Sequence, residues 1–575
     1  MKTRLAIACI IGILLMIAAV DDDRDGMLIQ KPMSDISSMT ISYTEHDPVI
    51  ISDNQDFETQ GWPGSGIEGD PYLIEGIRIV NTSTCISIED TTVFFEINHC
   101  FISSPDLSEE AGIYFQNVTH GTVCGCTIKK HTPGVYIKDS PTSSLMDNIA
   151  SGNSHDGYLI SESENSILMN NTAADTSGSG FWLRWSSGCT LESNIATRSS
   201  AGGILLLESP NCILENNTSS DNRKGISLDF SGNCTILNNT LTGNGLIIDG
   251  YPLAEWLHDV SGNTVNGRQL GYFRSATDTV VDGSLYGQVI LANCSGVSVR
   301  DGLFTDASTG ILVGYGTECI LENNEATDNS RAAFMLNLST NCTLKNNLAM
   351  DNRYGYYLYK SERCTVINNL ASNSVDDGFS LTHSHACTLM DNVAVGNSSI
   401  GFNLWNVHDC LLINNTADTS GDGFVLWLSF ECQLIKNKAM NNSDRGFHLD
   451  YSHNCTLKEN TALHNEIGVI LSDSNFTFLI LNKFGYNTNS NAYDAGYSNE
   501  WNNSTTGNYW SDYTGTGEYL IPGPAGSVDH HPFILVLHTT PEPSNGLDVI
   551  LIMTGVFATI GVLVILVAVY VMYNE

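Results

Sequence analysis

The chain has 575 residues, and its 25 lysine and arginine residues against 63 aspartate and glutamate residues give a formal net charge of −38. A negative field of this size repels phosphate backbones, which excludes nucleic acid as a partner. Charged residues make up 15 % of the chain and hydrophobic residues 42 %, so the composition supports a large core and excludes wholesale disorder.

The first twenty residues predict a secretory signal peptide or an N-terminal anchor. Lys2 and Arg4 precede a short apolar run over residues 5–20, and three aspartates, residues 21–23, follow it. This is the charge and length pattern of a secretory signal. No clean cleavage site stands before the aspartates, so removal of the segment and its retention as an anchor both stay open.

Residues 47–110 have looser strand patterns and the motif Gly61-Trp62-Pro63-Gly64, which indicates an N-terminal cap followed by the first coils. A repeat occupies residues 111–491. Its cysteines recur at intervals of 22 or 23 residues, a spacing typical of stacked repeats. This column comprises Cys189, Cys212, Cys234, Cys319, Cys342, Cys364, Cys387, Cys410, Cys432 and Cys455.

Two other positions recur in register with the cysteines. A glycine stands nine residues before almost every one of them, and an asparagine stands five residues after each. Two earlier repeats have serine in the cysteine position. The asparagine column comprises Asn148, Asn171, Asn194, Asn217, Asn239, Asn324, Asn347, Asn369, Asn392, Asn415, Asn437 and Asn460.

Within each repeat the apolar residues alternate, as in Phe379 and Leu381 or Phe402 and Leu404, which is the period of a β-strand. Three short strands per repeat bury their inner face only when coil stacks upon coil. We therefore predict an all-β chain: a right-handed parallel β-helix with three strands per coil and about fifteen coils. Residues 246–287 interrupt the period and predict an insertion on one side of the rod.

The two columns have structural interpretations. Asparagines at one corner of successive coils are expected to pass amide hydrogen bonds from coil to coil. Cysteines on the inner face are expected to pack as small hydrophobic residues. Disulfides between neighbouring coils are the alternative, since export favours oxidation, although stacked side chains about 4.8 Å apart exceed the Cβ separation of about 3.8 Å in a disulfide.

The C-terminal part predicts a cap and a membrane anchor. Residues 492–535 contain the run Gly507-Asn508-Tyr509-Trp510 and would cap the last coil. A linker over residues 538–548 precedes the uncharged apolar run 549–572, which is long enough to cross a bilayer. These segments predict a single-pass protein of the cell membrane, anchored near its C-terminus, with the β-helix extracellular.

Aromatic and polar side chains mark the outer face of the first strand in several coils. Exposed rings on a secreted rod are typical of a contact surface, and flat rings stack on sugars. Packing between neighbouring coils is the other interpretation. The predicted glycan- or partner-binding stripe comprises Trp182, Trp185, Tyr357, Tyr359, His383, Trp405, Trp427, His448, Asp450 and Tyr451.

No complete catalytic constellation is recognisable in the sequence. Glycan-cleaving sites require paired carboxylates on one face, or a cation with a basic residue. Asp376-Asp377 has neither partner motif and is expected to be a solvated turn. Asp529-His530-His531 is a dense ligand group, but adjacent residues of an extended segment cannot all face one ion. We therefore predict no catalytic residue, no metal site and no cofactor.

The sequence resembles the NosD-type proteins in four motifs: the repeat G-[FI]-x-L-x-x-S-x-x-C-T-L-x-x-N, the opening Gly61-Trp62-Pro63-Gly64, the inserted motif at 263–267 and the C-terminal motif at 507–513. NosD-type proteins share the repeats of the carbohydrate-binding and sugar-hydrolysis (CASH) class. Membrane-anchored archaeal surface proteins are among this family's members. The resemblance covers residues 47–535 and implies the β-helix fold.

Three functions remain open on these grounds: a carbohydrate- or partner-binding surface rod, a polysaccharide lyase, hydrolase or epimerase acting on the first-strand face, and a copper accessory protein of the NosD kind. Sequons such as Asn233, Asn341 and Asn454 add an expectation of glycosylation.

Overall fold

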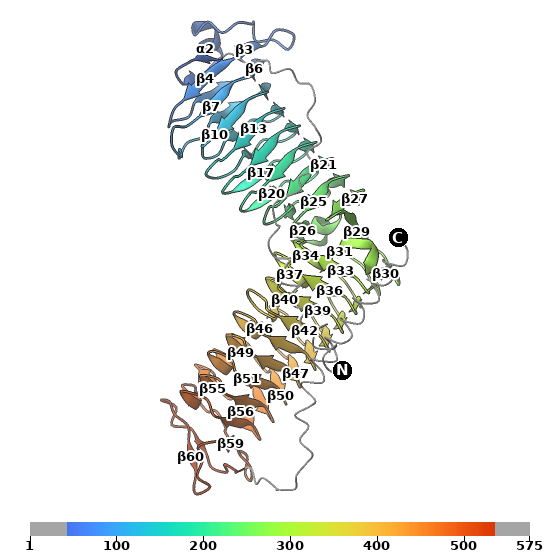
Figure 1. The fold of residues 1–575 in the computed structure, drawn as a ribbon, viewed down its shortest axis with the longest axis vertical. Coiled ribbons are helices and arrows are strands. Elements are labelled where there is room, and N and C mark those ends of the chain that lie inside the picture. Colours follow the sequence, from blue (N-terminus) through green and yellow to red (C-terminus); the bar gives the residue numbers. More distant parts are fainter. Residues whose placement is uncertain (1–42, 535–575) are drawn as a thin grey trace, which may run out of the picture.

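The computed structural model describes residues 43–534, which form stacked parallel coils in two rods that meet at an angle (Figure 1). We call residues 43–265 the N-terminal rod and residues 268–534 the C-terminal rod. The prediction of a parallel β-helix is confirmed, but the coils number about 19 rather than fifteen. The difference arises because residues 47–110 already form regular coils that lack the glycine and cysteine signature.

Each coil contributes one strand to each of three sheets. In the N-terminal rod, first strands form a nine-stranded sheet from β2 (Val49–Ile51) to β26 (Leu246–Asp249). Second strands form a nine-stranded sheet from β3 (Tyr72–Glu75) to β27 (Asp259–Ser261). Third strands run from β1 (Thr44–Glu45) to β28 (Thr264–Val265).

The C-terminal rod repeats this arrangement with a different connection. Its first strands begin at β29 (Arg268–Arg274) and β31 (Tyr286–Ala292) and end at β58 (Ser490–Asp494). Its second and third strands form two ten-stranded sheets, from β30 (Val280–Asp282) to β56 (Phe478–Ile480) and from β33 (Leu303–Thr305) to β59 (Tyr509–Trp510).

The residues between the rods do not form a side excursion, contrary to the predicted insertion. Residues 246–265 complete one more regular coil, and β28 and β29 then pair antiparallel as a hairpin. Through this hairpin the third-strand sheet of the N-terminal rod continues as the first-strand sheet of the C-terminal rod, which gives one sheet of 21 strands. The first strands of the two rods therefore lie in different sheets.

Side chains of the C-terminal rod cap the open edge of β26. The Gln288 side chain accepts a hydrogen bond from the Leu246 backbone N–H (2.9 Å) and donates one to the Leu246 carbonyl (2.8 Å). Ser308 Oγ accepts from the Gly245 N–H at 2.9 Å. These contacts give the backbone groups of Gly245 and Leu246 the partners that a following strand would otherwise supply.

The outer face of the first C-terminal strands is also buried at this junction. Ile290, Leu312 and Met335 point away from their own rod, and each is at most 1 % exposed because it packs into the core of the N-terminal rod. Trp256, at the end of the 3-10 turn η1 (Leu253–Trp256), covers Gly314, where an added Cβ would lie 2.1 Å from the indole ring.

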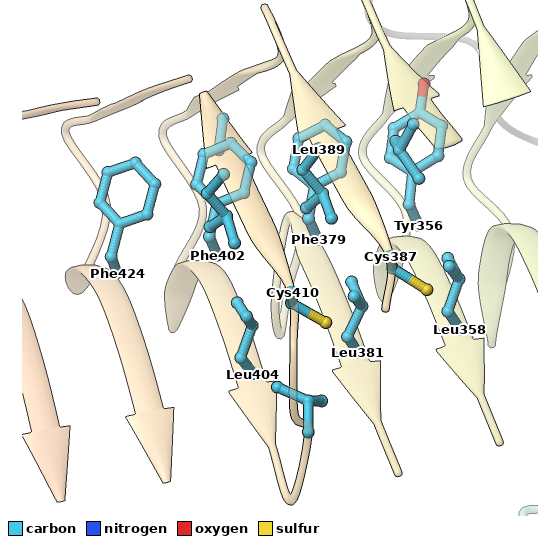
Figure 2. Packing of buried hydrophobic residues seen from close by; sticks show 14 of the residues in the cluster. Tyr356, Leu358, Phe379, Leu381, Cys387, Leu389, Phe402, Leu404, Cys410 and Phe424 are labelled. Atoms are coloured by element: carbon cyan, nitrogen blue, oxygen red, sulfur yellow. The ribbon is translucent and has the colours of Figure 1, made fainter. Parts of the chain in front are cut away.

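The two rods have separate hydrophobic cores. In the C-terminal rod the alternating phenylalanines stack in register, with ring centroids 4.7 Å apart for Phe379–Phe402 and for Phe402–Phe424, and interplanar angles of 3° and 4° (Figure 2). Tyr356 stacks on Phe379 at 4.6 Å and extends the column. The strand alternation thus places one large ring per coil at the same interior position.

The ten predicted column cysteines are buried, and all fifteen cysteines of residues 43–534 have free thiols. The Cys387 thiol donates weakly to backbone carbonyls of His385 (3.4 Å) and Ser361 (3.6 Å). Ser143, in the same position of an earlier coil, donates to the Ser140 carbonyl at 2.8 Å. The site therefore offers a backbone acceptor to either residue type.

The predicted asparagine column forms two continuous ladders, one in each rod. The Asn392 side-chain oxygen accepts from the Asn369 backbone N–H and amide, both at 3.0 Å, and its amide donates to the Asn415 oxygen (2.9 Å) and the Val366 carbonyl (2.8 Å). One ladder begins at Asn148 and ends at Asn263, and the other runs from Asn324 to Asn508. Asn263, Asn482 and Asn508 are members that the cysteine spacing did not identify.

Each end of the described chain is covered by local structure. Helix α2 (Asn54–Thr59) begins at Asp53, whose side chain accepts from the Gln55 and Asp56 backbone N–H groups, and it buries Phe57 against the first coils. At the other end Trp501 and Trp510 are buried, and the hairpin of β60 (Tyr519–Leu520) and β61 (Val528–Asp529) lies over them.

The predicted membrane topology is corrected. Between residues 43 and 534 no helix is long and apolar enough to cross a membrane. The assignment as a single-pass membrane protein with an extracellular rod is therefore withdrawn. The signal or anchor at 1–20, the linker at 538–548 and the apolar run at 549–572 lie outside the described residues.

Candidate functional site

The ten predicted stripe residues do not share one face. Trp182 lies on β17 (Ser179–Arg184) of the N-terminal first-strand sheet, and Trp185 follows that strand. The remaining eight belong to the C-terminal rod, whose first strands continue a different sheet. The change of face at the junction therefore divides the predicted stripe into separate groups.

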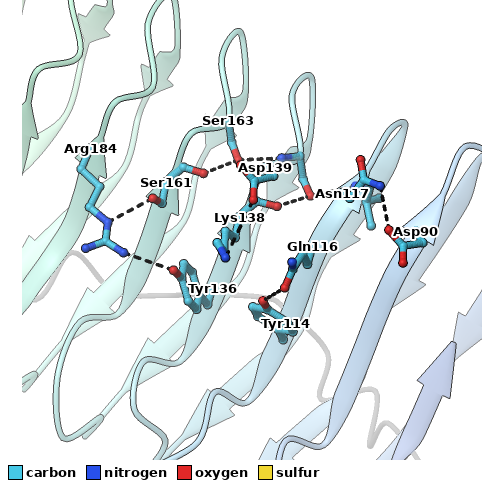
Figure 3. Close-up of polar contacts among 12 residues, drawn as sticks. Asp90, Tyr114, Gln116, Asn117, Tyr136, Lys138, Asp139, Ser161, Ser163 and Arg184 are labelled. Atoms are coloured by element: carbon cyan, nitrogen blue, oxygen red, sulfur yellow. Dashed lines mark hydrogen bonds and ion pairs between the residues drawn. The ribbon is translucent and has the colours of Figure 1, made fainter. Parts of the chain in front are cut away.

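The N-terminal group lies beside Arg184, whose polar contacts to Ser161 and Tyr136 are drawn in Figure 3. The Arg184 guanidinium lies over the rings of Trp182 (5.5 Å) and Trp185 (5.2 Å). It also donates to Ser161 Oγ (3.0 Å) and to the Tyr136 hydroxyl (3.2 Å). The guanidinium is thus held by neighbouring coils, and Trp185 is the exposed member of the group.

The C-terminal group contains a ladder of exposed rings. Trp405, at the end of β46 (Ile400–Trp405), stacks on Trp427, at the end of β49 (Asp422–Trp427), with centroids 5.5 Å apart and an interplanar angle of 13°. Both are exposed, at 40 % and 44 %. His383 lies beside Trp405 at 5.6 Å. His448, Asp450 and Tyr451 continue this surface on the next coil.

Tyr357 and Tyr359 lie on the preceding coil of the same sheet, and the ring centroids of Tyr359 and His383 are 6.0 Å apart. Both tyrosines also line a cleft of about 530 Å³ at the junction of the two rods. We call this the junction cleft. One wall comes from β23 (Ile226–Asp229) and β26 of the N-terminal rod, and the other from β37 (Ala332–Asn337) and β40 (Tyr354–Tyr359). Its lining includes Asp229, Phe230, Asp249, Tyr251, Arg331, Asn337, Arg353, Tyr357 and Tyr359.

Two aspartates lie side by side in the junction cleft. Asp229 and Asp249 are register partners at the ends of β23 and β26, so their backbones are one strand spacing apart, about 4.8 Å. Asp249 is held by two side chains of the C-terminal rod: Arg331 Nη2 lies 2.5 Å from its Oδ2, and Asn337 Nδ2 donates to its Oδ1 at 3.0 Å. Asp229 accepts from Ser227 Oγ at 3.1 Å.

The two carboxyl groups differ in their electrostatic surroundings. Burial raises the pKa of Asp229; the nearby Lys224 ammonium offsets part of this shift, and the Asp249 carboxylate adds to it. Asp249 has a direct ion pair with Arg331, whereas within residues 43–534 Asp229 has none. The cleft thus holds an ion-paired aspartate next to an aspartate whose pKa is raised by burial.

Tyrosines and a lysine complete the wall of the cleft. The Lys360 ammonium lies 4.3 Å from the centre of the Tyr251 ring and 5.3 Å from that of Tyr359, and so connects the two rods by cation–π contacts. Burial raises the pKa of Tyr357, so its hydroxyl stays protonated at neutral pH and available as a hydrogen-bond donor.

The sequence did not indicate most of these residues. Asp229 and Asp249 occupy outward positions four residues after the repeat glycine or its equivalent, where the side chain varies freely. Only the antiparallel hairpin and the resulting change of sheet bring them opposite Arg331 and Asn337. The Asn266-Gly267 pair forms the turn of that hairpin and is the signal for it in the sequence. The sequence alone does not show that the chain changes sheets there.

The described part of the chain offers no convergent metal ligands, since no group of three or more histidine, cysteine, aspartate or glutamate residues is placed to hold an ion. The column cysteines face the packed interior of the rods and are at most 1 % exposed. In the group at 529–531, Asp529 accepts from the Trp510 indole (3.0 Å), whereas His530 contacts Glu518 (2.6 Å).

The fold defines the class: a right-handed parallel β-helix protein. The model of the right-handed beta helix region matches residues 65–210, 111–270 and 258–394, which together cover more than half of the chain. The model described as periplasmic copper-binding protein (NosD) matches residues 351–515, within the C-terminal rod. The chain therefore belongs to the right-handed β-helix family, with a NosD-type segment. The residues described above do not fit the copper that this family description names.

Solved structures of other β-helix proteins are similar in fold. A doubly substituted periplasmic alginate epimerase AlgG is 13 % identical, covers 60 % of this chain and 77 % of its own, and has a TM-score of 0.33. The A-module of the Azotobacter vinelandii mannuronan C-5 epimerase AlgE4 is 14 % identical over 70 % of this chain and 91 % of its own (TM-score 0.26).

The surface adhesin PfbA of Streptococcus pneumoniae is 10 % identical over 69 % of this chain and 91 % of its own (TM-score 0.33). Sequence identities and TM-scores this low do not indicate a shared function. No curated protein matches the sequence.

Proposed function

We propose that the protein is a saccharide-binding β-helix and that the junction cleft is its binding site. The observation that carries this proposal is the composition of the cleft: tyrosine rings from both rods line it together with two aspartates, one of which is held by an arginine and an asparagine. Aromatic rings beside fixed polar groups suit a carbohydrate, because a sugar presents an apolar face to a ring and hydroxyl groups to donors and acceptors.

The size and shape of the cleft support a short saccharide as the ligand. Its volume of about 530 Å³ lies within the usual range of small-molecule sites, roughly 300–1,000 Å³. Its polar groups are oriented before a ligand arrives, since Arg331 and Asn337 already bond to Asp249. Preorganised donors lower the cost of ordering side chains on binding.

The Trp405–Trp427 ladder is the second candidate surface for the same ligand class. Its two indoles are nearly parallel, stacked on each other and exposed, and they offer apolar contact to sugar rings of a chain that runs along the rod. It lacks the dense set of fixed hydrogen-bonding groups found in the junction cleft, which is why we place the principal site in the cleft.

A glycan array with three forms of the protein tests the proposal. The wild type should bind a defined subset of glycans. The Tyr357→Ala, Tyr359→Ala double variant should lose this binding, and the Trp405→Ala, Trp427→Ala double variant should keep it. Loss of binding in the tryptophan variant alone would move the site to the ladder, and the absence of any bound glycan for the wild type would contradict the proposal.

A further inference from the structure

We infer that the Trp405–Trp427 ladder is a docking surface for an arginine-bearing segment of a partner protein, whose guanidinium groups lie over the indole rings beside Asp450. The inference is independent of the proposed saccharide site, which lies in the junction cleft. It rests on the strand register beyond the ladder, on the charges around it, and on the way the chain covers similar rings elsewhere.

The strand register places a carboxylate directly beyond the ladder. Trp405 pairs with Trp427, and Trp427 pairs with Asp450 at the end of β52 (Arg445–Asp450). Neighbouring coils are about 4.8 Å apart, so the face of the Trp427 ring that Trp405 does not cover lies on the side of this carboxylate. A cation at this point contacts the ring and the carboxylate together.

The charges around Asp450 favour an added cation. Burial and the neighbouring Asp473 carboxylate raise its pKa, and the Arg445 guanidinium opposes this shift. That guanidinium is engaged elsewhere, since its Nη1 lies 3.6 Å from Asp422 Oδ2 and its Nη2 lies 3.2 Å from Asp444 Oδ2. Within residues 43–534 Asp450 has no ion pair of its own, so a partner's guanidinium would supply the missing counter-charge.

The surrounding turns add negative charge along the same side of the rod. No lysine or arginine occurs in the turns that follow the first strands of these coils, residues 405–410, 427–432, 450–455 and 473–478. Each of these turns carries one acidic residue: Asp409, Glu431, Asp450 and Asp473. The surface therefore complements a positive partner. The formal net charge of −38 also disfavours a second copy of this chain as the occupant.

Similar outward rings in the N-terminal rod are covered by a cation of the chain itself. The Arg184 guanidinium lies 5.5 Å from the centre of the Trp182 ring and 5.2 Å from that of Trp185. In the described part of the chain no lysine or arginine lies over Trp405 or Trp427 in this way. The ladder thus presents the same kind of ring surface and leaves it open to a cation from another molecule.

The chemistry favours arginine, and the repetition favours a polypeptide. A planar guanidinium stacks flat on an aromatic ring and still donates hydrogen bonds to a carboxylate at its edge, which an ammonium group does less well. A single exposed cation–π contact is weak. Because rings and carboxylates recur on successive coils, one segment with several arginines engages several of them at once and gains affinity from each.

The test uses the full-length protein and three fluorescent peptides, with four repeats of Arg-Gly-Ser, Lys-Gly-Ser or Gln-Gly-Ser. Fluorescence anisotropy measures their binding. We expect the arginine peptide to bind, the lysine peptide to bind at least about threefold more weakly, and the glutamine peptide not to bind. Because the contact includes ion pairs, added salt should weaken the binding of the arginine peptide.

Variants locate the bound peptide. The Trp405→Ala, Trp427→Ala double variant should lower the affinity for the arginine peptide about tenfold. The Trp405→Phe, Trp427→Phe double variant keeps a ring at each position and should stay within about threefold of the wild type. Asp450→Asn should lower the affinity about threefold. Asp351→Asn makes the same change in an exposed turn after the third strand β39 (Leu348–Met350), and this matched control should have no measurable effect.

Four results would overturn the inference. The first is that no peptide binds the wild type, and the second is that the tryptophan-to-alanine variant binds the arginine peptide unchanged. The third is an equal loss for Asp351→Asn and Asp450→Asn, which would indicate unspecific attraction to an acidic rod. The fourth is that the tryptophan-to-alanine variant loses glycan binding but keeps peptide binding. The Tyr357→Ala, Tyr359→Ala variant should bind the peptide as the wild type does, which separates this test from that of the junction cleft.

Discussion

The two rods share one repeat but differ in what surrounds their first strands. In the N-terminal rod the first-strand sheet ends at β26, and side chains such as Gln288 cap its edge. In the C-terminal rod the first strands continue the third-strand sheet of the other rod, and their earliest outward residues are buried. The comparison shows that a position in the repeat does not by itself determine its environment, because one hairpin changes which face it occupies.

The largest predicted effect concerns the separate asparagine ladders. Asn392→Ala removes hydrogen bonds to Asn369, Val366 and Asn415, leaving buried groups unsatisfied, and should lower the stability of the C-terminal rod by about 4 kcal/mol. Asn194→Ala should do the same in the N-terminal rod. Urea unfolding followed by circular dichroism should show two transitions, each shifted by its own variant. If both variants shift every transition equally, the rods are one cooperative unit.

The next effect tests the cap at the junction. Gln288→Ala leaves the N–H and carbonyl of Leu246 without partners and should cost about 3 kcal/mol, measured as a shift of the urea midpoint. Gln433→Ala changes the same residue type at an exposed position of the C-terminal rod and should change stability by less than about 0.5 kcal/mol. Equal effects of the two variants would show that the edge of β26 does not require the Gln288 amide.

A smaller effect is expected in the thiol column, which both rods contain. Cys387→Ser should cost about 1 kcal/mol or less, because backbone carbonyls of His385 and Ser361 are within reach and Ser143 already uses such an acceptor. Thermal melts of Cys387→Ser and Cys387→Ala provide the measurement. The competing disulfide model requires almost no free thiols in the unfolded, non-reduced protein, and a thiol count would reveal this.

The smallest effect concerns the pH dependence of the junction. Because the pKa of Asp229 is raised in the folded state, its ionised form costs stability at neutral pH, and the stability of the protonated form is lost as pH rises through the folded pKa. Asp229→Asn should therefore raise the Tm at pH 7. This gain should vanish below the unfolded pKa of about 3.9, where Asp229 is protonated in both states. A variant that lowers the Tm at pH 7 would contradict this environment.

The repeat predicted the fold well because its columns depend on local rules. Alternation along a strand determines which residues face inward, and stacking places Phe379 on Phe402 and Asn392 beside Asn415. The predicted number of coils was too low because the coils within residues 47–110 do not carry the repeat signature. Their inner positions hold varied residues such as Ile86, Phe95 and Ile102.

The candidate site could not be predicted in the same way. Its residues lie far apart in sequence, and their meeting depends on the antiparallel pairing of β28 with β29. No periodic pattern encodes the contact of Asp249 with Arg331 or of Lys360 with Tyr251, because each crosses between rods. The sequence identified Tyr357 and Tyr359 as outward aromatics of the stripe, but the junction separates Trp182 and Trp185 from them.

A crystal structure of the protein with a saccharide bound on the glycan array tests the central claim most directly. The account predicts that the sugar occupies the junction cleft and contacts both rods, with a ring face on Tyr357 or Tyr359 and hydroxyl groups near Asp249 and Arg331. A sugar bound only over Trp405 and Trp427, or only at an end of a rod, would contradict it.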